Sequence, residues 1–386
     1  MRLLQFLIFF GIVLSVHTLV NYYIFIRGLK TFDQASLLRQ LYTYGFWFLA
    51  ASFFIGRILE KVYLSHMSDF FTWAGSFWLA AMLYLFIAVF LIDLLRFTDR
   101  FIPFLDRIIP AVLIAKPYIF TITLAIFTFF LILAGHINAT LPKITRIQIP
   151  VSKEYTSIAD LKVVLVTDVH LGTIISTKRV RKIVDKINAL QPDLVLMAGD
   201  IVDEDLAPVI RQNLGGILAN IDARLGVIGS TGNHEYIGGA EQAVAYLQSH
   251  GITMLRDSAL AVTDNLYIIG REDVESMRFG GNRRKPLDSI MQNIPEKTFT
   301  IVLDHQPRAI EEARQNGAHL VLSGHTHHGQ LWPLNHITQA MFPLSYGLKR
   351  FGETYAYVSN GVGSWGPPVR IGNRPEIVLI NFRPAQ

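Results

Sequence analysis

The sequence predicts a chain of two parts, a helical membrane domain followed by an α/β domain of two packed sheets. Of the 386 residues, 51% are hydrophobic and only 17% are charged, whereas soluble globular chains carry about 25% charged residues. The shortage of charge is confined to the region before about residue 140. After about Leu161, short β-branched runs alternate with helical stretches, which is typical of a globular α/β domain.

Four stretches of the first part lack Asp, Glu, Lys and Arg: Leu3–Ile26, Gln40–Gly56, Phe70–Ile92 and Pro117–Pro142. A membrane-spanning helix needs about 20 largely apolar residues, and the second stretch meets this only marginally. The first stretch is too long for a signal peptide and lacks a small-residue cleavage site. We therefore expect a multi-pass membrane protein in contact with lipids. It would have about four spans in residues 1–142, a linker at 143–160 and a second domain at 161–386.

The basic residues of the loops indicate on which side of the membrane the second domain lies. Four spans place both termini on one side of the membrane, and the basic residues of the loops favour an extracytoplasmic second domain. Counting the basic residues that follow the fourth span makes the two sides equal.

The net charge of +5 is modest and the basic residues form no stripe, so no nucleic acid partner is expected. The absence of cysteine excludes disulfides, thiolate metal sites and a cysteine nucleophile.

The second domain begins with a β-α-β-α-β pattern. Strand-like runs at 161–167, 193–199 and 225–231 alternate with helical patterns at 178–190, 206–220 and 239–251. Such alternation predicts a mainly parallel sheet. Further strand-like runs lie at 252–255, 259–263, 266–270, 299–303, 319–322, 354–358 and 376–381. Two sheets packed together, with helices outside, accommodate this number of strands.

Polar side chains follow five of these strands at the point where each ends. They are Asp168 and His170, then Asp200, then Asn233, His234 and Glu235, then His305, and last His325, His327 and His328. Ligands of α/β sheets bind at the carboxyl ends of strands. Asp, Asn and His ligands suit Mn, Fe or Zn. Seven candidate ligands are too many for one tetrahedral site and favour two metals that share a bridging carboxylate.

The ordered set Asp168-x-His170, Gly199-Asp200, Gly232-Asn233-His234-Glu235, His305 and Gly324-His325-Thr326-His327 resembles the calcineurin-like metallophosphoesterase superfamily. The stretches "HQP", "SGHTHHGQ" and "SNGVGSWGPPVRIGNRPEI" are similar to its membrane-anchored branch of bacterial and vertebrate transmembrane metallophosphoesterases. That branch commonly has Gly where this chain has His328. The resemblance implies a four-layer α/β/β/α sandwich.

The resemblance also implies a role for each motif residue. The first metal would be held by Asp168, His170 and His327, and the second by Asn233, His305 and His325, with Asp200 as the bridge. His234 would face the substrate and protonate the leaving group as a catalytic acid. Asp203 and Glu235 are candidates for fixing the second nitrogen of a histidine ligand, or else solvated loop carboxylates. His328 would line the pocket or face solvent.

These roles imply a membrane-anchored hydrolase with two divalent metal ions, Mn, Fe or Zn. It would cleave a phosphomonoester, phosphodiester or pyrophosphate by attack of a metal-bridged hydroxide. The membrane anchor favours a lipid-linked phosphate ester. Alternatives are an enzyme similar to UDP-2,3-diacylglucosamine hydrolase of lipid A synthesis, and a non-catalytic membrane receptor or transporter with a regulatory phosphoesterase-fold domain. Trp332 and Trp365 either form an apolar lip at the bilayer or take part in ordinary loop packing.

Overall fold

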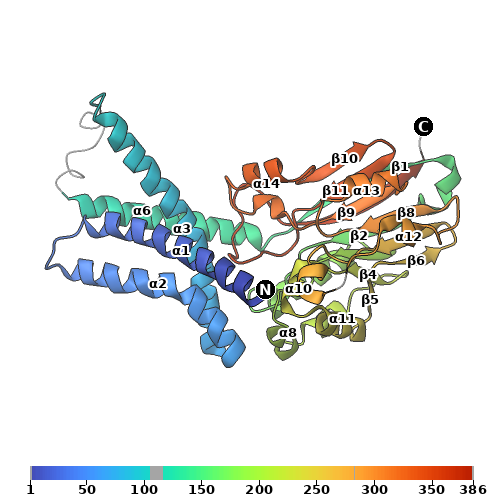
Figure 1. Ribbon diagram of the computed structural model, residues 1–386, viewed down its shortest axis with the longest axis horizontal. Coiled ribbons are helices and arrows are strands. Elements are labelled where there is room, and N and C mark those ends of the chain that lie inside the picture. The colour runs from blue at the N-terminus through green and yellow to red at the C-terminus, as the bar shows by residue number, and fades with distance from the viewer. Residues whose placement is uncertain (1, 105–115, 282, 385–386) are drawn as a thin grey trace. The chain divides into compact units, whose positions relative to one another are not determined.

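The computed structural model describes residues 2–104, 116–281 and 283–384. The chain divides into two compact units, Met1–Gly135 and His136–Gln386. The first unit consists of long helices and the second of two sheets with shorter helices (Figure 1).

The helices of the first unit are α1 (Arg2–Leu29), α2 (Leu37–Val62), α3 (His66–Asp99) and α6 (Pro117–Ala139), whose last turn belongs to the second unit. Three segments among the described residues are long and apolar enough to cross a membrane: Phe10–Leu29 in α1, and all of α3 and α6. The expected spans at 3–26, 70–92 and 117–142 therefore correspond to helices of this kind.

The expectation of about four spans is corrected by α2. The stretch Gln40–Gly56 lies inside this helix, which is not among the three candidate spans. Its uncharged stretch is short because Arg39 precedes it and Arg57 follows it. The helix still packs closely on its neighbours, since Phe46 of α2 shares a buried cluster with Ile24 of α1 and Trp78 of α3.

Two sheets of six strands form the second unit. The first has the order β1-β12-β2-β3-β4-β5, and the second the order β10-β11-β9-β8-β7-β6. The first sheet contains β1 (Lys143–Val151), β2 (Lys162–Val166), β3 (Leu194–Ala198), β4 (Val227–Ser230), β5 (Ile252–Leu255) and β12 (Glu376–Pro384). The second contains β6 (Ser258–Thr263), β7 (Leu266–Gly270), β8 (Phe299–Leu303), β9 (Leu320–Ser323), β10 (Gly347–Phe351) and β11 (Thr354–Val358).

The central strands of both sheets are parallel. Strands β2, β3, β4 and β5 pair in parallel in the first sheet, and β7, β8, β9 and β11 in the second. Antiparallel pairs occur at β12–β2, β6–β7 and β10–β11. The β-α-β-α-β pattern therefore predicted the parallel part of the first sheet correctly.

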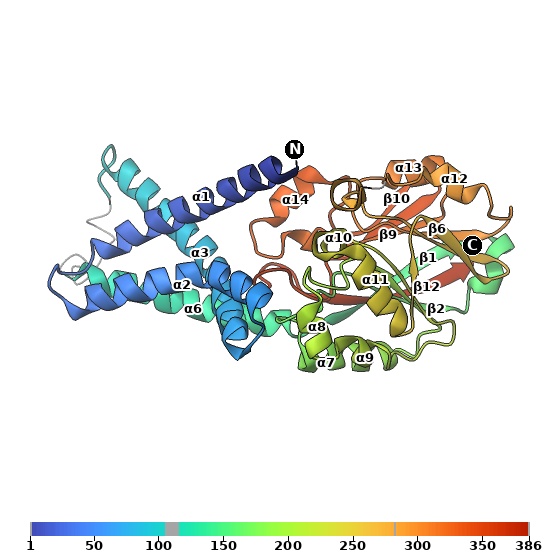
Figure 2. The same cartoon turned by 60° about the horizontal axis from the view of Figure 1, so that its bottom comes forward.

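Helices cover the outer faces of the sheets (Figure 2). They are α7 (Thr177–Asn188), α8 (Ala207–Arg211), α9 (Leu214–Leu218), α11 (Ala240–Ser249), α12 (Leu287–Met291) and α13 (Ile310–Gln315). Two further helices, α10 (Asn233–Gly238) and α14 (Asn335–Met341), follow β4 and the short turn η3 (His327–Gly329). The short turns η1 (Lys153–Ile158) and η2 (Ser276–Gly280) complete the unit. On the second sheet, Leu287 of α12 and Ile310 of α13 pack on Val302 and Val321. The architecture is the layered α/β/β/α arrangement that the resemblance implies.

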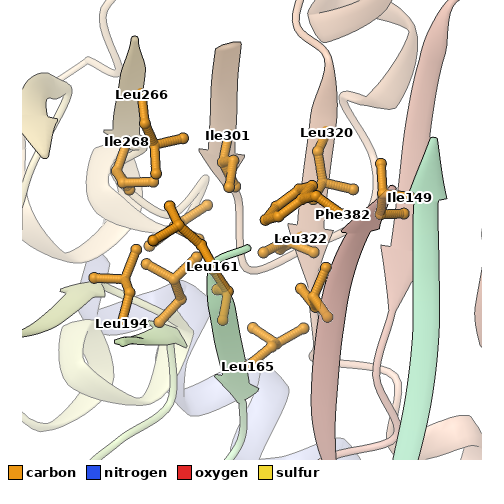
Figure 3. Packing of buried hydrophobic residues seen from close by; sticks show 14 of the residues in the cluster. Ile149, Leu161, Leu165, Leu194, Leu266, Ile268, Ile301, Leu320, Leu322 and Phe382 are labelled. Atoms are coloured by element: carbon orange, nitrogen blue, oxygen red, sulfur yellow. The ribbon is translucent and has the colours of Figure 1, made fainter. Parts of the chain in front are cut away.

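A single apolar cluster fills the space between the sheets (Figure 3). Leu165 and Leu194 contribute from the first sheet, and Ile268, Ile301 and Leu320 from the second; each of these side chains is fully buried. Burying such a side chain stabilises the fold by about 1.5–3 kcal/mol. This core fixes the strands whose ends carry the site.

The region expected as a linker contains a strand. Residues 143–151 form β1, which pairs in parallel with β12 over its whole length, and η1 follows it. Ile147, Ile149 and Val151 are buried while the residues between them are exposed, which is the alternation of a half-buried strand. The described sheet residues therefore begin directly after α6.

Candidate metal centre

The polar strand ends of both sheets meet at one place. Asp168 and His170 follow β2, Asp200 follows β3, and Asn233 follows β4. The second sheet contributes His305 after β8, and His325 and His327 after β9. The structure therefore brings together all seven residues that the sequence suggested as metal ligands, in two adjoining groups.

The first group consists of Asp168, His170 and His327, whose ligand atoms all lie within 4.8 Å of one another. The Nε2 atoms of His170 and His327 are 3.0 Å apart. Nε2 of His327 is also 3.4 Å from Oδ1 of Asp168. Two imidazole nitrogens and a carboxylate oxygen thus converge, which is the donor set of a divalent ion.

The second group consists of Asp200, His305 and His325. Nε2 of His305 lies 2.9 Å from Oδ2 of Asp200. Nδ1 of His325 lies 2.8 Å from Oδ1 of Asn233, which adds the amide oxygen to the group. The donors are again nitrogen and oxygen, with two histidines.

Asp200 lies between the two groups. Its Oδ2 atom is 2.9 Å from His305 in the second group and 3.9 Å from Nε2 of His170 in the first. Its Oδ1 atom accepts a hydrogen bond from the backbone N–H of His234 at 2.9 Å, which fixes the carboxylate plane. This is the position that a bridging carboxylate requires.

Burial and neighbouring charges shift the pKa values of the donors in both directions. Burial opposes the charged form of His305, but the charge of Asp200 raises its pKa well above the usual value. Burial raises the pKa of Asp168, and its Oδ2 atom is buried without a hydrogen-bond partner among the described residues. Burial lowers the pKa of His325 to about 3, and burial together with the charge of Arg370 lowers that of His327 well below its usual value. Both imidazoles are therefore neutral, which is the form that binds metal. The residues fit divalent ions because a buried carboxylate oxygen without a partner needs a compensating charge.

The backbone is strained at the same residues. Asp168, His170, Asp200, His325 and His327 all have φ between 45° and 69°, a region that residues other than glycine rarely occupy. Such outliers cluster at functional sites. Gly324 allows the close approach of two loops, since a Cβ atom there would lie 2.2 Å from Oδ2 of Asp168.

Two groups lie near the second nitrogen of histidines of the centre. Nδ1 of His305 lies 2.9 Å from the carbonyl oxygen of Ala198. Oδ1 of Asp203 lies 3.5 Å from Nδ1 of His170 and 3.1 Å from Nδ1 of His234, so its carboxylate faces both rings, although neither nitrogen has a hydrogen-bond partner among the described residues. Glu235 differs from the expectation of an outer acceptor for a histidine, because it accepts from the backbone N–H groups of Asp200, Val202 and Gly232 and contacts no imidazole of the site by hydrogen bond.

His234 lies beside the first group. Its ring stands edge-on to that of His170, with centroids 4.7 Å apart. Burial opposes its charged form, but the charges of Asp200 and Asp203 outweigh burial and raise the pKa of His234 to about 9. The ring of Trp365 lies on another side of it, at 5.9 Å between centroids.

His328 lies outside both metal groups. Its ring packs on Tyr346, with centroids 5.2 Å apart, and its Nδ1 atom is 3.4 Å from Oγ of Ser345. It is half-buried. That His328 is no metal ligand stays a prediction.

Sequence reasoning missed Arg370. This side chain is fully buried, and its Nη2 atom lies 3.0 Å from Nδ1 of His327. Its guanidinium also donates to the carbonyl oxygens of Asn360 and Gly363. Because a guanidinium only donates, Nδ1 of His327 accepts this hydrogen bond, and the proton of the neutral ring lies on Nε2, which faces the first group. A single arginine in a glycine-rich tail gave no signal of this contact.

Comparison with known proteins agrees with this geometry. The model of the family "Calcineurin-like phosphoesterase" matches residues 161–329. A metallophosphoesterase of Aquifex aeolicus is 31% identical over 58% of this chain and 85% of its own length. The chain belongs to the calcineurin-like metallophosphoesterases. A metallophosphoesterase of Campylobacter jejuni is 29% identical over 98% of this chain and 99% of its own.

Relatives with membrane segments are also similar. The transmembrane protein with metallophosphoesterase domain of Danio rerio is 34% identical over 69% of this chain and 63% of its own length. This metallophosphoesterase thus spans less than two thirds of the vertebrate relative. Among solved structures, a 5'-nucleotidase precursor of Thermus thermophilus matches 57% of this chain and 54% of its own, with 14% identity and a TM-score of 0.36.

Proposed function

We propose that this protein is a membrane-anchored phosphoester hydrolase with two divalent metal ions, Mn, Fe or Zn. The observation that carries the proposal is the position of Asp200, whose carboxylate lies between two groups of histidine and carboxylate donors. The first ion would be held by Asp168, His170 and His327, and the second by Asn233, His305 and His325, with Asp200 shared. Two ions in such a site neutralise phosphate oxygens and acidify a water molecule.

The protein's own groups then position and protonate the substrate. Asp203 lies at Nδ1 of His234, which leaves Nε2 as the nitrogen that gives a proton to the leaving oxygen of a phosphomonoester, phosphodiester or pyrophosphate. The backbone N–H of His234 is fixed on Asp200, so that His234 and the shared carboxylate keep a constant geometry. Arg370 keeps the ring of His327 from turning away.

A substrate panel tests the proposal. The purified full-length protein in detergent would be assayed with Mn on phosphodiesters, nucleotide pyrophosphates and lipid phosphates. We expect turnover by wild type and a loss of at least about 100-fold in Asp200→Ala, because both ions lose a ligand. Asp264→Ala is the matched control, since this exposed carboxylate lies in the β6–β7 turn. Equal turnover by wild type and Asp200→Ala would contradict hydrolysis at this site.

The candidate spans support a location in the membrane and a lipid-linked substrate. With α1, α3 and α6 crossing, the N-terminus and the catalytic unit lie on opposite sides. The side of the catalytic unit then carries the larger number of flanking basic residues: Arg27, Lys30, Arg39, Arg57, Lys61, Lys143, Arg146 and Lys153. The other side carries Arg2, Arg96, Arg100, Arg107 and Lys116. We therefore propose that the catalytic unit faces the cytoplasm, which reverses the orientation expected from four spans.

A cytoplasmic site would admit a nucleotide-linked lipid such as UDP-2,3-diacylglucosamine. A fluorescent-protein fusion at the C-terminus tests the orientation, with an alkaline phosphatase fusion as its counterpart. We expect fluorescence without phosphatase activity. Phosphatase activity without fluorescence would place the unit outside and exclude cytosolic nucleotide-linked substrates.

The receptor or transporter alternatives have less support. A phosphoesterase fold that has lost its catalytic activity would have no need to keep seven converging metal donors. In the helical unit, polar groups pair with one another: Nε1 of Trp78 donates to Oδ1 of Asn21 at 2.9 Å, and Arg27 pairs with Asp93 at 2.8 Å. These groups therefore have structural partners, and Arg27 and Asp93 also line a cavity of about 320 Å³ in this unit.

A further inference from the structure

The loop between β11 and β12, residues 359–375, forms part of the wall of the metal centre. Its Trp365 ring lies 5.9 Å from the ring of His234, and its Arg370 contacts His327. Gln330, which directly follows η3, holds the loop in place. Its Nε2 atom donates to the carbonyl oxygens of Trp365 and Pro367 at 2.9 and 2.8 Å. Trp365 is therefore fixed beside His234.

The same loop is fastened to the last turn of α6. Nδ1 of His136 lies 2.7 Å from the carbonyl oxygen of Pro368. Nδ2 of Asn138 donates to the carbonyl oxygens of Arg370 and Asn373 at 3.0 and 2.7 Å. All of these residues belong to the second unit, so the distance between the end of α6 and the metal centre is set within that unit.

Two arginines hold the chain where α6 ends. Arg179 donates to the carbonyl oxygen of Ala139, and Arg374 donates to that of Leu141 at 2.6 Å. Cations are favourable at the C-terminus of a helix, where carbonyl groups lack partners. The helix end is thus a fixed structural feature of the catalytic unit.

Two large aromatic side chains are exposed beside this attachment. Trp365 is 54% exposed and Trp332 is 52% exposed; we call this pair the aromatic rim. The backbone N–H of Trp332 donates to the carbonyl oxygen of Ile371 at 2.8 Å, which places it next to the same loop. Tryptophan is enriched at membrane–water interfaces because its ring is apolar and its N–H is polar.

The length of α6 indicates which part of the helix would lie at the membrane surface. Its 23 residues extend about 35 Å, and the hydrocarbon core of a bilayer is about 30 Å thick. If α6 crosses the bilayer, its last turn therefore lies at the level of the headgroups. The loop that carries Trp365 is hydrogen-bonded to that turn.

We infer that the aromatic rim rests in the interface of the bilayer that α6 crosses, so that the metal centre opens at headgroup level. The substrate would then be an amphiphile whose phosphate group enters from the plane of the membrane. This inference rests on the proposed function for the chemistry, and on α6 as a span for the geometry. It assigns a membrane-contacting role to Trp332 and Trp365.

Spin labelling tests the rim directly, since the chain has no cysteine. Trp332→Cys, Trp365→Cys and the control Asp264→Cys would each be labelled with a nitroxide in the full-length protein in phosphatidylcholine–phosphatidylglycerol nanodiscs. Asp264 is exposed in the turn before β7, at the edge of the sheet opposite the site. We expect labels at 332 and 365 to be relaxed more by oxygen than by an aqueous nickel chelate, and the label at 264 to show the reverse.

Labels at 332 and 365 that respond like the label at 264 would overturn the inference. A second measurement avoids cysteine variants. The emission of Trp332 and Trp365 is obtained as the difference between wild type and a Trp332→Phe, Trp365→Phe double variant, and brominated lipids should quench this difference. A difference that brominated lipids leave unchanged would also count against the rim. Neither measurement uses activity. Lipid contact by the aromatic rim in a protein that hydrolyses no substrate would therefore contradict the proposed function but still support the membrane-contacting role of the rim.

Discussion

At the scale of single residues, the carboxylate of Asp203 lies beside two histidines, His170 and His234, which we propose as a metal ligand and as the catalytic acid. Its Oδ1 atom lies 3.5 Å from His170 and 3.1 Å from His234. We predict that Asp203→Asn lowers kcat or metal affinity by about 10–100-fold, as is usual for outer-shell partners. Steady-state kinetics and metal titration of the full-length protein measure this, with Asp264→Asn as the control. Unchanged kcat and affinity would show that Asp203 is only a loop carboxylate.

His328 provides a contrasting test. The residue has φ 47°, which glycine adopts without strain, and its ring contacts Tyr346 and not the metal groups. His328→Gly should therefore keep both metal ions and the thermal midpoint, while the preference among phosphate esters changes. Metal analysis and the substrate panel check this. Loss of an ion from the variant would show that His328 is a ligand.

The convergence of the residues proposed as ligands could be predicted from the sequence because each follows a strand that ends at the same edge. Their positive φ angles and the contact of Arg370 with His327 could not. Both depend on how loops from different strands meet, which sequence spacing does not encode. The same reason explains why Glu235, a candidate acceptor for a histidine nitrogen, instead accepts hydrogen bonds from backbone N–H groups.

At the scale of elements, β1 is the first strand after α6 and belongs to the catalytic unit. Ile149 is fully buried in the cluster between the sheets. We predict that Ile149→Ala destabilises the unit by about 2–5 kcal/mol, the usual cost of such a truncation. Gln148→Ala, at the neighbouring exposed position, should change stability by less than about 0.5 kcal/mol. Thermal unfolding in detergent compares the two, and equal midpoints would mean that β1 is a loose edge.

Elements with strong local patterns were predicted and others were not. The helix over 177–188 follows from its apolar spacing, and the runs at 299–303 and 319–322 are strands. The helix expected over 206–220 is divided into α8 and α9, because Asn213 has φ 50°. Strand β10, with exposed Leu348 and Lys349, carries no alternation that would mark it as a strand. The span expected at 40–56 lies in a helix whose ends are charged.

At the scale of the whole molecule, the metal ions should contribute to stability. Without them, Oδ2 of Asp168 lies buried with no hydrogen-bond partner among the described residues. A ligand that binds only the folded state stabilises it by about 2.7 kcal/mol at a concentration 100 times its Kd. We predict that EDTA lowers the thermal midpoint of the full-length protein and that Mn restores it. A midpoint that does not respond to EDTA or Mn would contradict binding of resident ions.

The metal content of the purified full-length protein tests the central claim most directly. Inductively coupled plasma mass spectrometry would count ions per chain for wild type, for Asp200→Asn and for the control Asp264→Asn. Because Asp200 lies between both donor groups, we predict about two ions in wild type and in the control, and a clear loss in Asp200→Asn. Equal metal content in wild type and Asp200→Asn, or no bound metal in wild type, would contradict a shared two-metal centre.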